Sequence, residues 1–460
     1  MKKLLLVFTA LALCSCSFDN KTGIWRDAST LPVENKTSES ISENLPEIRY
    51  ENIFSKNKLF NEEKDPDKFI NVEVDEPIRI VNWPEQYAVP TNNISNYSHS
   101  ANRILVSKSS KLSKNLSSKN NSSNKIIFYQ NNLVSYDHKG IIFIYSLSLN
   151  KKIFEFNFYK KNFKKFNKKI NLIINENILY ASDNLGYLYA LNLSDKSILW
   201  AKNYGIPFRS NIKFVDNQIF LANQDNVILS IDSNTGEKNW QFATSPTFLK
   251  TDFENNFALD VINNNILFLN TTGELYSINY LSQNINWVLN FKNYSLAGEA
   301  GDTELFISQP LVIKNNNLII TTEKNILSYN LQTAFKNWSF SANPIFKPII
   351  TFSNTFVLLK ENLLICLDNL NGNVIWSKNI LKNIENKNIK DDFGSLADFK
   401  IVNNKINIYS KNGNLLSFNP SNGDLTFFSK INKSGIRSEI FFLNDKMLFV
   451  DNKNKLLKFN

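Results

Sequence analysis

Residues 226–240, NVILSIDSNTGEKNW, contain the pattern that decides the fold of this chain. A run of apolar residues leads to Asp232, and Trp240 follows eight residues later. Four other stretches keep the same distance between their first residue and their tryptophan: residues 186–200, 273–287, 324–338 and 362–376. Since this internal distance is constant while the gaps between copies vary, one structural unit is repeated with loops of different lengths.

Three further copies carry the apolar run without the tryptophan. The eight copies begin at Gly140, Gly186, Asn226, Gly273, Lys324, Asn362, Gly413 and Asn454, with a mean period of about 45 residues. The fourth residue after the start is usually small, as at Ala190 and Ser230. A small side chain on a strand fits where one sheet packs closely on the next. Cys366 occupies this position, so we expect it to serve packing rather than reactivity.

Each copy is preceded by a further pair of strand-like runs and, except for the last, followed by a turn and another strand. Asn371-Gly372 is one such turn, because glycine accepts a positive φ. Four strands in roughly 40–50 residues are typical of one propeller blade. An amphipathic pattern of helical period is absent from the repeats, which excludes helical solenoids. The sequence therefore predicts an all-β, eight-bladed β-propeller over residues 76–460.

The last copy, residues 454–460, ends the chain before an outer strand can follow. Residues 79–83, RIVNW, match the tryptophan strands of the other blades. We therefore expect this N-terminal strand, with Trp83, to complete the last blade and close the ring, which removes a free sheet edge. In the alternative interpretation, Trp83 is an aromatic residue of a linker.

The N-terminus is typical of an exported lipoprotein. Lys2 and Lys3 precede the apolar residues 4–13, which predicts a signal peptide over residues 1–15. Residues 13–16, LCSC, resemble a lipobox, and Cys16 is the expected lipidation site because bulky Leu13 disfavours Cys14. Ser17 favours sorting to the outer membrane. An ordinary secretory signal is the alternative.

Two stretches have the composition of chain without fixed structure. Residues 16–75 are polar and aperiodic, which predicts a disordered tether from the lipidated cysteine. Residues 107–124, rich in serine, lysine and asparagine, predict a flexible surface loop.

The net charge is +10, from 52 basic and 42 acidic residues, and becomes +8 when Lys2 and Lys3 leave with the signal peptide. Residues 151–169 are the densest basic run. We interpret them as a solvated strand edge and loop, with contact to anionic lipid or nucleic acid as the alternative. We expect no nucleic-acid partner. Cys366 is the only cysteine beyond Cys16, so no disulfide is available to the folded part.

Asp232, Gly236 and Trp240 resemble the tryptophan-docking motif of PQQ-like propellers, Ala-x-Asp-x-x-x-Gly-x-x-x-Trp, with Ser230 in place of the alanine. Phe154 and Phe427 take the aromatic position in two other copies. The resemblance implies that the aromatic side chain bridges neighbouring blades. The expected inter-blade residues are Trp83, Trp200, Trp240, Trp287, Trp338 and Trp376.

Two groups of proteins share this motif. PQQ-dependent dehydrogenases bind a quinone and a Ca²⁺ ion and often have a vicinal disulfide, whereas this chain has two histidines, His99 and His138, and no acidic cluster that resembles a calcium loop. We therefore expect no catalytic residue, no cofactor and no metal. A PQQ-dependent periplasmic dehydrogenase is kept as an alternative.

The other group is the BamB family, lipoproteins of the outer-membrane β-barrel assembly machinery. This chain resembles it along its whole length, from the lipobox and tether to the end within the last blade, where residues 435–439, GIRSE, resemble the family's step before the final strands. The resemblance implies a non-enzymatic scaffold on the periplasmic face of the outer membrane. It would bind the POTRA domains of the central subunit as a monomer within a larger complex. A propeller that binds another envelope component is the alternative.

The resemblance also implies where the partner binds. The family uses loops after the third and fourth tryptophan strands, here residues 247–252 and 294–304. Leu249 and Lys250 match an apolar and basic contact approximately, while Asp302 and Glu304 lie near, but not at, the family's acidic pair. Functional contacts concentrate on loops that a rigid scaffold carries. Ordinary surface loops are the alternative.

Overall fold

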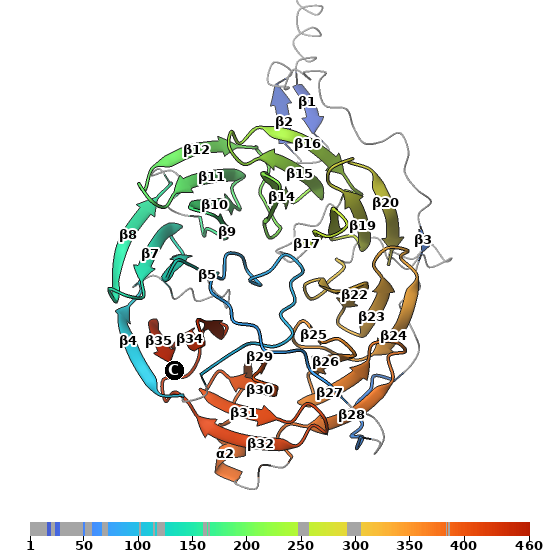
Figure 1. Ribbon diagram of the computed structural model, residues 1–460. Coiled ribbons are helices and arrows are strands. Elements are labelled where there is room, and N and C mark those ends of the chain that lie inside the picture. The colour runs from blue at the N-terminus through green and yellow to red at the C-terminus, as the bar shows by residue number, and fades with distance from the viewer. Residues whose placement is uncertain are drawn as a thin grey trace, which may run out of the picture.

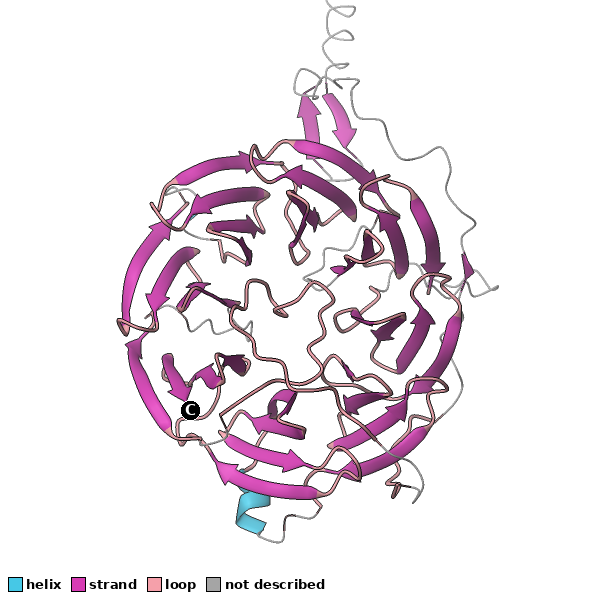
Figure 2. Cartoon of the chain, viewed as in Figure 1, coloured by secondary structure: helices cyan, strands magenta, loops and turns pink. Residues whose placement is uncertain are grey.

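The computed structural model describes residues 16–19, 24–27, 49–50, 58–66, 72–100, 103–113, 116, 125–159, 163, 166–246, 257–291, 305–382, 384 and 387–460. Within them, eight antiparallel sheets stand around a central axis (Figure 1). Figure 2 shows that strands make up nearly all of the regular structure and that the short helix α2 (Lys387–Asp392) lies outside the ring. The predicted eight-bladed β-propeller is confirmed.

The first seven blades each take four consecutive strands, numbered here from the axis outward. Blade 1 consists of β5 (Ile126–Tyr129), β6 (Asn132–Tyr136), β7 (Ile141–Ser146) and β8 (Lys151–Asn157), and blade 2 of β9 (Ile170–Asn175), β10 (Ile178–Asp183), β11 (Tyr187–Asn192) and β12 (Ile198–Asn203). Blade 3 consists of β13 (Lys213–Val215), β14 (Gln218–Ala222), β15 (Val227–Asp232) and β16 (Lys238–Ala243). Blade 4 consists of β17 (Phe257–Asp260), β18 (Asn265–Leu269), β19 (Glu274–Asn279) and β20 (Ile285–Asn290).

Blade 5 consists of β21 (Val312–Lys314), β22 (Asn317–Thr321), β23 (Asn325–Asn330) and β24 (Lys336–Ser341). Blade 6 consists of β25 (Ile349–Ile350), β26 (Asn354–Leu358), β27 (Leu363–Asp368) and β28 (Val374–Asn379). Blade 7 consists of β29 (Leu396–Val402), β30 (Lys405–Ser410), β31 (Asn414–Phe418) and β32 (Leu425–Lys430). Blade 8 contains β33 (Phe441–Leu443), β34 (Lys446–Val450) and β35 (Lys455–Phe459), with β4 (Leu105–Lys111) outermost.

The repeated phrase forms the third strand of each blade. Its first residue has a positive φ in seven of the eight copies, which explains why glycine or asparagine stands there. Four residues later the small side chain lies directly opposite the aromatic residue of the outer strand, as in Ser230 with Trp240 and Cys366 with Trp376. Because such cross-strand pairs share one face of the sheet, the small residue leaves room for the indole.

Blade 8 is closed by an N-terminal strand, as expected, but that strand is β4 and not residues 79–83. Ser107 of β4 pairs with Lys458 of β35, in the place where other blades have a tryptophan. β4 overlaps the start of residues 107–124, the stretch that was expected to be a flexible loop, so that expectation was wrong for residues 107–111. An outermost strand needs only backbone partners on one side, so serine and lysine suffice and leave no apolar pattern.

Trp83 lies at the inner end of blade 1 instead of in an outer strand. Its backbone exchanges two hydrogen bonds, of 2.7 and 2.8 Å, with Phe128 of β5. Its side chain is 1% exposed and stacks on Tyr97, with the ring centroids 5.8 Å apart. The expectation that Trp83 closes blade 8 was therefore wrong, because the match to the tryptophan strands was local.

Residues 75–100, which we call the axial segment, run across the axis and appear in blue at the centre of Figure 1. They hydrogen-bond to all eight blades in order: Trp83 to Phe128, Pro84 to Ile174, Glu85 to Lys213, Pro90 to Leu259, Thr91 to Ile313, Asn93 to Ile350, Tyr97 to Ile401, and Ser98 to Asp445. These contacts make the axial segment a common partner of the innermost strands.

The axial segment lies at one end of the axis. Ser98 and Asn96 contact Asp445 and Asn404, which lie in turns between the first and second strands of their blades. Since antiparallel strands alternate, the turns between second and third strands and the connections from each outer strand to the next blade lie on the opposite face. We call that opposite side the loop face.

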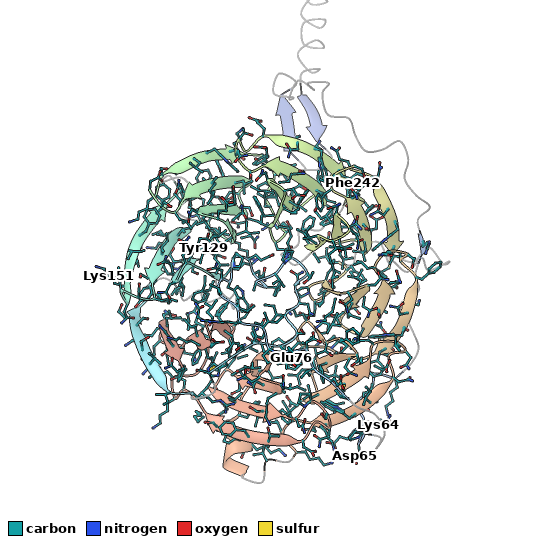
Figure 3. The ribbon with its side chains drawn as sticks, in the orientation of Figure 1. Lys64, Asp65, Glu76, Tyr129, Lys151 and Phe242 are labelled. Atoms are coloured by element: carbon teal, nitrogen blue, oxygen red, sulfur yellow. The ribbon has the colours of Figure 1, made fainter. Side chains whose placement is uncertain are left out.

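Part of the expected tether lies against the outer edges of three blades. β3 (Arg49–Tyr50) pairs in parallel with β20, Phe60 N donates to Ser341 O at 2.9 Å, and Lys64 exchanges two backbone hydrogen bonds with Ser377. Outermost strands offer unpaired backbone groups, which explains why a polar segment binds there. Residues 58–66 therefore do not behave as a disordered tether. Figure 3 places Lys64 and Asp65 at the rim and Glu76 near the axis.

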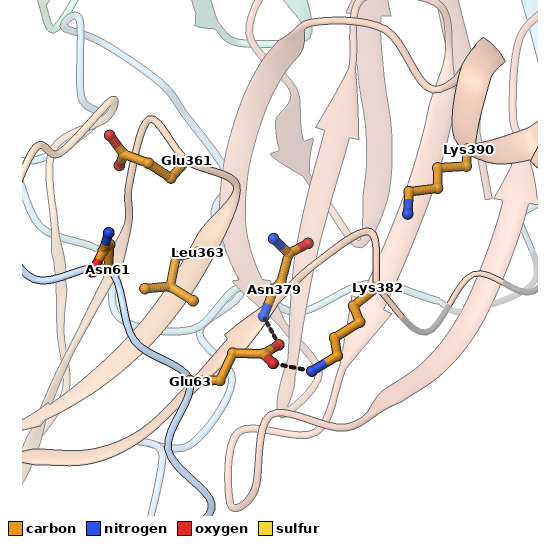
Figure 4. A pocket seen from close by; sticks show the side chains of 7 residues that line it. All are labelled: Asn61, Glu63, Glu361, Leu363, Asn379, Lys382 and Lys390. Carbon is orange, nitrogen blue, oxygen red and sulfur yellow. Dashed lines mark hydrogen bonds and ion pairs between the residues drawn. The ribbon is translucent and has the colours of Figure 1, made fainter.

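Side chains also hold this segment on blade 6. Figure 4 shows the Glu63 carboxylate, which is paired with Lys382 and accepts a 3.0 Å hydrogen bond from the Asn379 backbone. These two contacts lower the pKa of Glu63.

The chain before the axial segment is described only in part. β1 (Cys16–Asp19) and β2 (Ile24–Asp27) form a hairpin, while the predicted signal peptide, residues 1–15, lies outside the described residues. In the described part of the chain, no helix has the length and apolar character that a membrane crossing requires.

Candidate partner-binding face

The four predicted partner-binding residues, Leu249, Lys250, Asp302 and Glu304, lie outside the described residues. The ends of both loops are described. The first loop connects β16 to β17 and the second connects β20 to β21, so both join an outer strand to the next blade. Both loops therefore begin and end on the loop face, one on each side of blade 4.

The first loop begins at a buried carboxylate of blade 4. Ser245 Oγ donates to Glu274 Oε1 at 2.6 Å, and the Ser245 backbone N–H donates to Oε2 at 3.3 Å. Tyr276 and Asn270 also donate to Glu274 Oε2, at 2.9 and 2.8 Å. Burial raises the pKa of Tyr276, which keeps its phenol a donor. Glu274 is 5% exposed, so its carboxylate has lost most of its hydration. These four donors replace that hydration with charge-assisted hydrogen bonds.

The second loop begins and ends on the same turn of blade 4. Phe291 N donates to Gly273 O at 2.8 Å, and Phe306 N donates to Thr271 O at 3.0 Å. The two phenyl rings stack with centroids 5.6 Å apart. A Cβ atom on Gly273 would stand 3.1 Å from Phe306, so glycine is needed for this close approach. The turn of residues 270–274 thus holds the start of the first loop and both ends of the second.

Blade 3 supports the same turn through Asn226, the first residue of its repeated phrase. Asn226 Nδ2 donates to Ser245 O at 3.1 Å, while Asn226 Oδ1 accepts from Thr271 Oγ1 at 3.0 Å. Thr244 Oγ1 donates to Asn226 O at 2.8 Å and accepts from Asn270 at 3.0 Å. Sequence reasoning did not single out Asn226 or Glu274 as supports for the loops; the recurrence of asparagine at phrase starts was the available signal. The result is a polar network that fixes the loop bases across a blade boundary.

The tryptophans lie at blade boundaries. Four donate their Nε1–H to a carbonyl in the turn of the next blade: Trp200 to Ser233 at 2.9 Å, Trp287 to Leu331 at 3.1 Å, Trp338 to Asn369 at 2.9 Å and Trp376 to Pro420 at 2.8 Å. These turns join third and fourth strands and so lie opposite the loop face. Trp240 is buried against Phe220, without such a bond within the described residues.

A cavity of about 640 Å³ occupies the axis and opens on the loop face. Tyr87 of the axial segment lines its inner end. Its wall comes from the connections into blades 5, 6 and 8 and from β29 of blade 7. Among the lining residues are Pro310, Ile345, Phe346, Lys347, Phe399, Lys400, Ile436 and Glu439.

A calcium–quinone centre does not fit this cavity. Asp398 is already bound to Lys400 at 3.1 Å and accepts the Ile440 N–H at 2.7 Å. Over the described residues, no three His, Cys, Asp or Glu side chains are grouped closely enough to hold a metal ion. Calcium sites require several oxygen ligands, which the lysine-rich wall does not offer.

Comparison with known proteins gives a family match by sequence and a fold match by structure. A family model described as outer membrane protein assembly factor BamB matches residues 160–344 and 306–460. No curated protein matches the chain. The crystal structure of BamB from Moraxella catarrhalis is similar, with a TM-score of 0.58 and 12% identity over 77% of this chain and 99% of that one.

Quinohemoprotein alcohol dehydrogenases share the fold as well. The Comamonas testosteroni structure has a TM-score of 0.59 and 9% identity, over 83% of this chain and 81% of that one. The Pseudomonas putida HK5 structure gives 0.57 and 8%, over 82% and 80%. At these identities the structural likeness shows the propeller alone, because one fold serves several functions.

Proposed function

The chain belongs to the family of outer membrane protein assembly factor BamB, and from this membership we propose that it is a non-enzymatic scaffold of the outer-membrane protein assembly complex. It binds the periplasmic POTRA domains of the central subunit and so aids insertion of β-barrel proteins. The observation that carries this proposal is the family match, which extends over blades 2 to 8.

The interface that we propose consists of the two loops of the loop face. Leu249 and Lys250 supply an apolar and a cationic contact from the first loop, and Asp302 and Glu304 supply carboxylates from the second. Their common support is the turn of residues 270–274 in blade 4, which holds the start of the first loop and both ends of the second. A scaffold that holds both loop bases in place lowers the conformational entropy lost on binding.

We also propose that the protein is exported and anchored by lipid. Cleavage after residue 15 leaves Cys16 as the lipidated first residue, and the body lies on the periplasmic side of the outer membrane. The protein acts as a monomer within the larger complex.

Crosslinking in the native envelope, followed by partner identification, tests the function. Capture of the central barrel-assembly subunit supports the proposal. Capture of peptidoglycan, a glycan carrier or an unrelated envelope protein in its place would overturn it.

Charge reversal tests the interface. Lys250→Glu or Asp302→Lys should weaken the purified complex by roughly tenfold or more, since charged contacts at an interface steer and orient the partner. Lys238→Glu is the matched control, because Lys238 is exposed on β16 next to a turn of the opposite face. If the two loop variants bind as tightly as this control, the loops are not the interface.

The dehydrogenase alternative rests on the shared propeller of the two quinohemoprotein structures. Reconstitution with PQQ and Ca²⁺, followed by a dye-linked alcohol oxidation assay, distinguishes it. Turnover in that assay would replace the scaffold proposal, whereas the family match favours no turnover.

A further inference from the structure

The axial cavity contains a partly buried lysine that forms no ion pair within the described residues. Lys347 lies in the connection between blades 5 and 6, and its Nζ is 5.6 Å from the centre of the Tyr87 ring. Across the described residues, no hydrogen bond or ion pair reaches this ammonium. A partly desolvated cation without a directly paired carboxylate is unfavourable, so it either loses its proton more readily or attracts an anion.

The acidic groups around Lys347 neutralise it only in part. Lys400 holds Asp398 at 3.1 Å, which leaves Glu439 as the carboxylate that faces both lysines. Lys411 and Arg437 also line the cavity, so its wall has more cationic than acidic side chains. Burial, together with Lys400, lowers the pKa of Lys347 to about 8.

We propose that the axial cavity binds a small carboxylate-bearing ligand, whose carboxylate pairs with Lys347 and whose apolar part packs on Phe346 and Ile436. The volume of about 640 Å³ lies within the usual range of small-ligand sites. Tyr87 lines the inner end, and Lys411 and Asn452 line the cavity from turns of the loop face, so the ligand enters from the loop face.

Charge favours a singly charged carboxylate over a phosphate group. A dianion would meet Glu439 and Asp398 as well as Lys347. A carboxylate that carries an amine would present that amine to Glu439, so amino acids and the C-terminal residues of peptides both fit this chemistry. The inference does not depend on the partner loops of the proposed function.

The pH dependence of binding follows from Lys347. The ligand binds the ammonium form, so its affinity is largest below pH 8 and falls as the pH rises through that value. The ion pair with Asp398 keeps Lys400 charged. Glu439 and Tyr87 are the remaining titratable groups that face the Lys347 amine. A bound carboxylate raises the pKa of Lys347, which NMR of the lysine side chain would detect.

Calorimetry on the full chain tests the proposal with three probes: leucine, the tripeptide Ala-Ala-Leu, and the same tripeptide with a C-terminal amide. We expect at least one free acid to bind and the amide to bind about tenfold or more weakly, since it lacks the ionised group. If leucine binds more tightly than the tripeptide, the ligand is a free amino acid. If the tripeptide binds more tightly, the ligand is the C-terminal end of a peptide.

Lys347→Gln should abolish binding of the acid, and Lys347→Arg should retain part of it. Lys382→Gln at the rim is the control, because it removes a lysine outside the cavity. Lys347→Gln should fold normally, since it removes a partly buried charge that forms no ion pair; an unchanged melting temperature would verify this. Equal affinity for acid and amide, equal affinity in Lys347→Gln, or no binding of any probe at millimolar concentration would overturn the proposal.

Discussion

The indole of Trp376 in blade 6 lies directly on Gly423 in blade 7. A Cβ atom added to Gly423 would stand 2.6 Å from Trp376 Cε3, and the indole Nε1 donates to Pro420 O, in the same turn, at 2.8 Å. Two other boundaries repeat this arrangement: Trp200 with Gly236, and Trp338 with Gly372. The glycine and tryptophan of the repeated motif therefore meet across blade boundaries, each with the partner that the neighbouring copy supplies.

Replacing Gly423 by alanine should destabilise the propeller by about 2–4 kcal/mol, because it adds a steric clash with Trp376 to a strained left-handed backbone. Gly205→Ala is the matched control. Gly205 has a φ of +81°, against +73° for Gly423, but a Cβ there would have no atom within 4 Å. We expect a loss of about 1 kcal/mol for the control. Equal losses in urea unfolding would show that backbone strain alone matters at these positions.

The boundary after blade 3 lacks this arrangement. Gln283, with a φ of +62°, takes the glycine position in the turn that faces Trp240, and the Trp240 Nε1 makes no hydrogen bond within the described residues. Trp240→Phe should therefore cost about 1 kcal/mol, while Trp376→Phe, which also leaves the Pro420 carbonyl unpaired, should cost about 2–3 kcal/mol. Chemical denaturation of both variants measures the difference. A larger loss for Trp240→Phe would contradict the assignment.

The blades could be predicted from the sequence because their deciding contacts are local. Ser230 and Trp240 meet within one hairpin, and that hairpin recurs with the same spacing. Closure of the ring depends on the pairing of Ser107 with Lys458, which lie far apart in the chain. These polar residues form no apolar pattern from which the pairing could be predicted. The order of hydrogen bonds along the axial segment is equally non-local: Asn92 Nδ2, for example, donates to the carbonyls of both Phe257 and Leu311.

The candidate interface, too, could be predicted from the sequence only in part. Leu249, Lys250, Asp302 and Glu304 were named through family resemblance alone, and their roles stay predictions. The support of the loops could not be inferred from sequence, because Ser245, which ties the first loop to Glu274, lies in a separate segment that meets blade 4 only in the folded ring. The other donors, Asn270 and Tyr276, are local to Glu274.

The axial segment is held in part by a buried ion pair between Glu85 and Lys213. Lys213 Nζ also donates to Asn92 Oδ1 at 2.7 Å, and its side chain is 1% exposed. Glu85→Gln should destabilise the protein by about 3–5 kcal/mol, because it leaves a buried ammonium without its counter-charge. The double variant Glu85→Gln/Lys213→Met should recover most of that loss. Thermal unfolding measures both; a Glu85→Gln variant that melts like the unchanged protein would show that the pair does not hold the segment.

His99, near the end of the axial segment, should make stability depend on pH. Burial lowers its pKa to about 4 from an ordinary value of 6.5, Arg103 adds to the effect and Asp445 opposes it. The unfolded chain therefore takes up a proton near pH 6.5, while the folded chain stays neutral until about pH 4. Because the unfolded state binds more protons in this window, stability rises with pH from 4 to 6.5 and is lost as the pH falls.

His99→Phe should flatten this part of the pH profile, since phenylalanine keeps a ring against Phe442, whose centroid is 5.6 Å from that of His99, and does not titrate. Urea unfolding at pH 4.5, 5.5 and 7 measures the slope in both proteins. The expected result is a smaller decrease in the free energy of unfolding for His99→Phe between pH 7 and 4.5. Identical slopes would assign the acid sensitivity to carboxylates elsewhere in the propeller and remove His99 as its source.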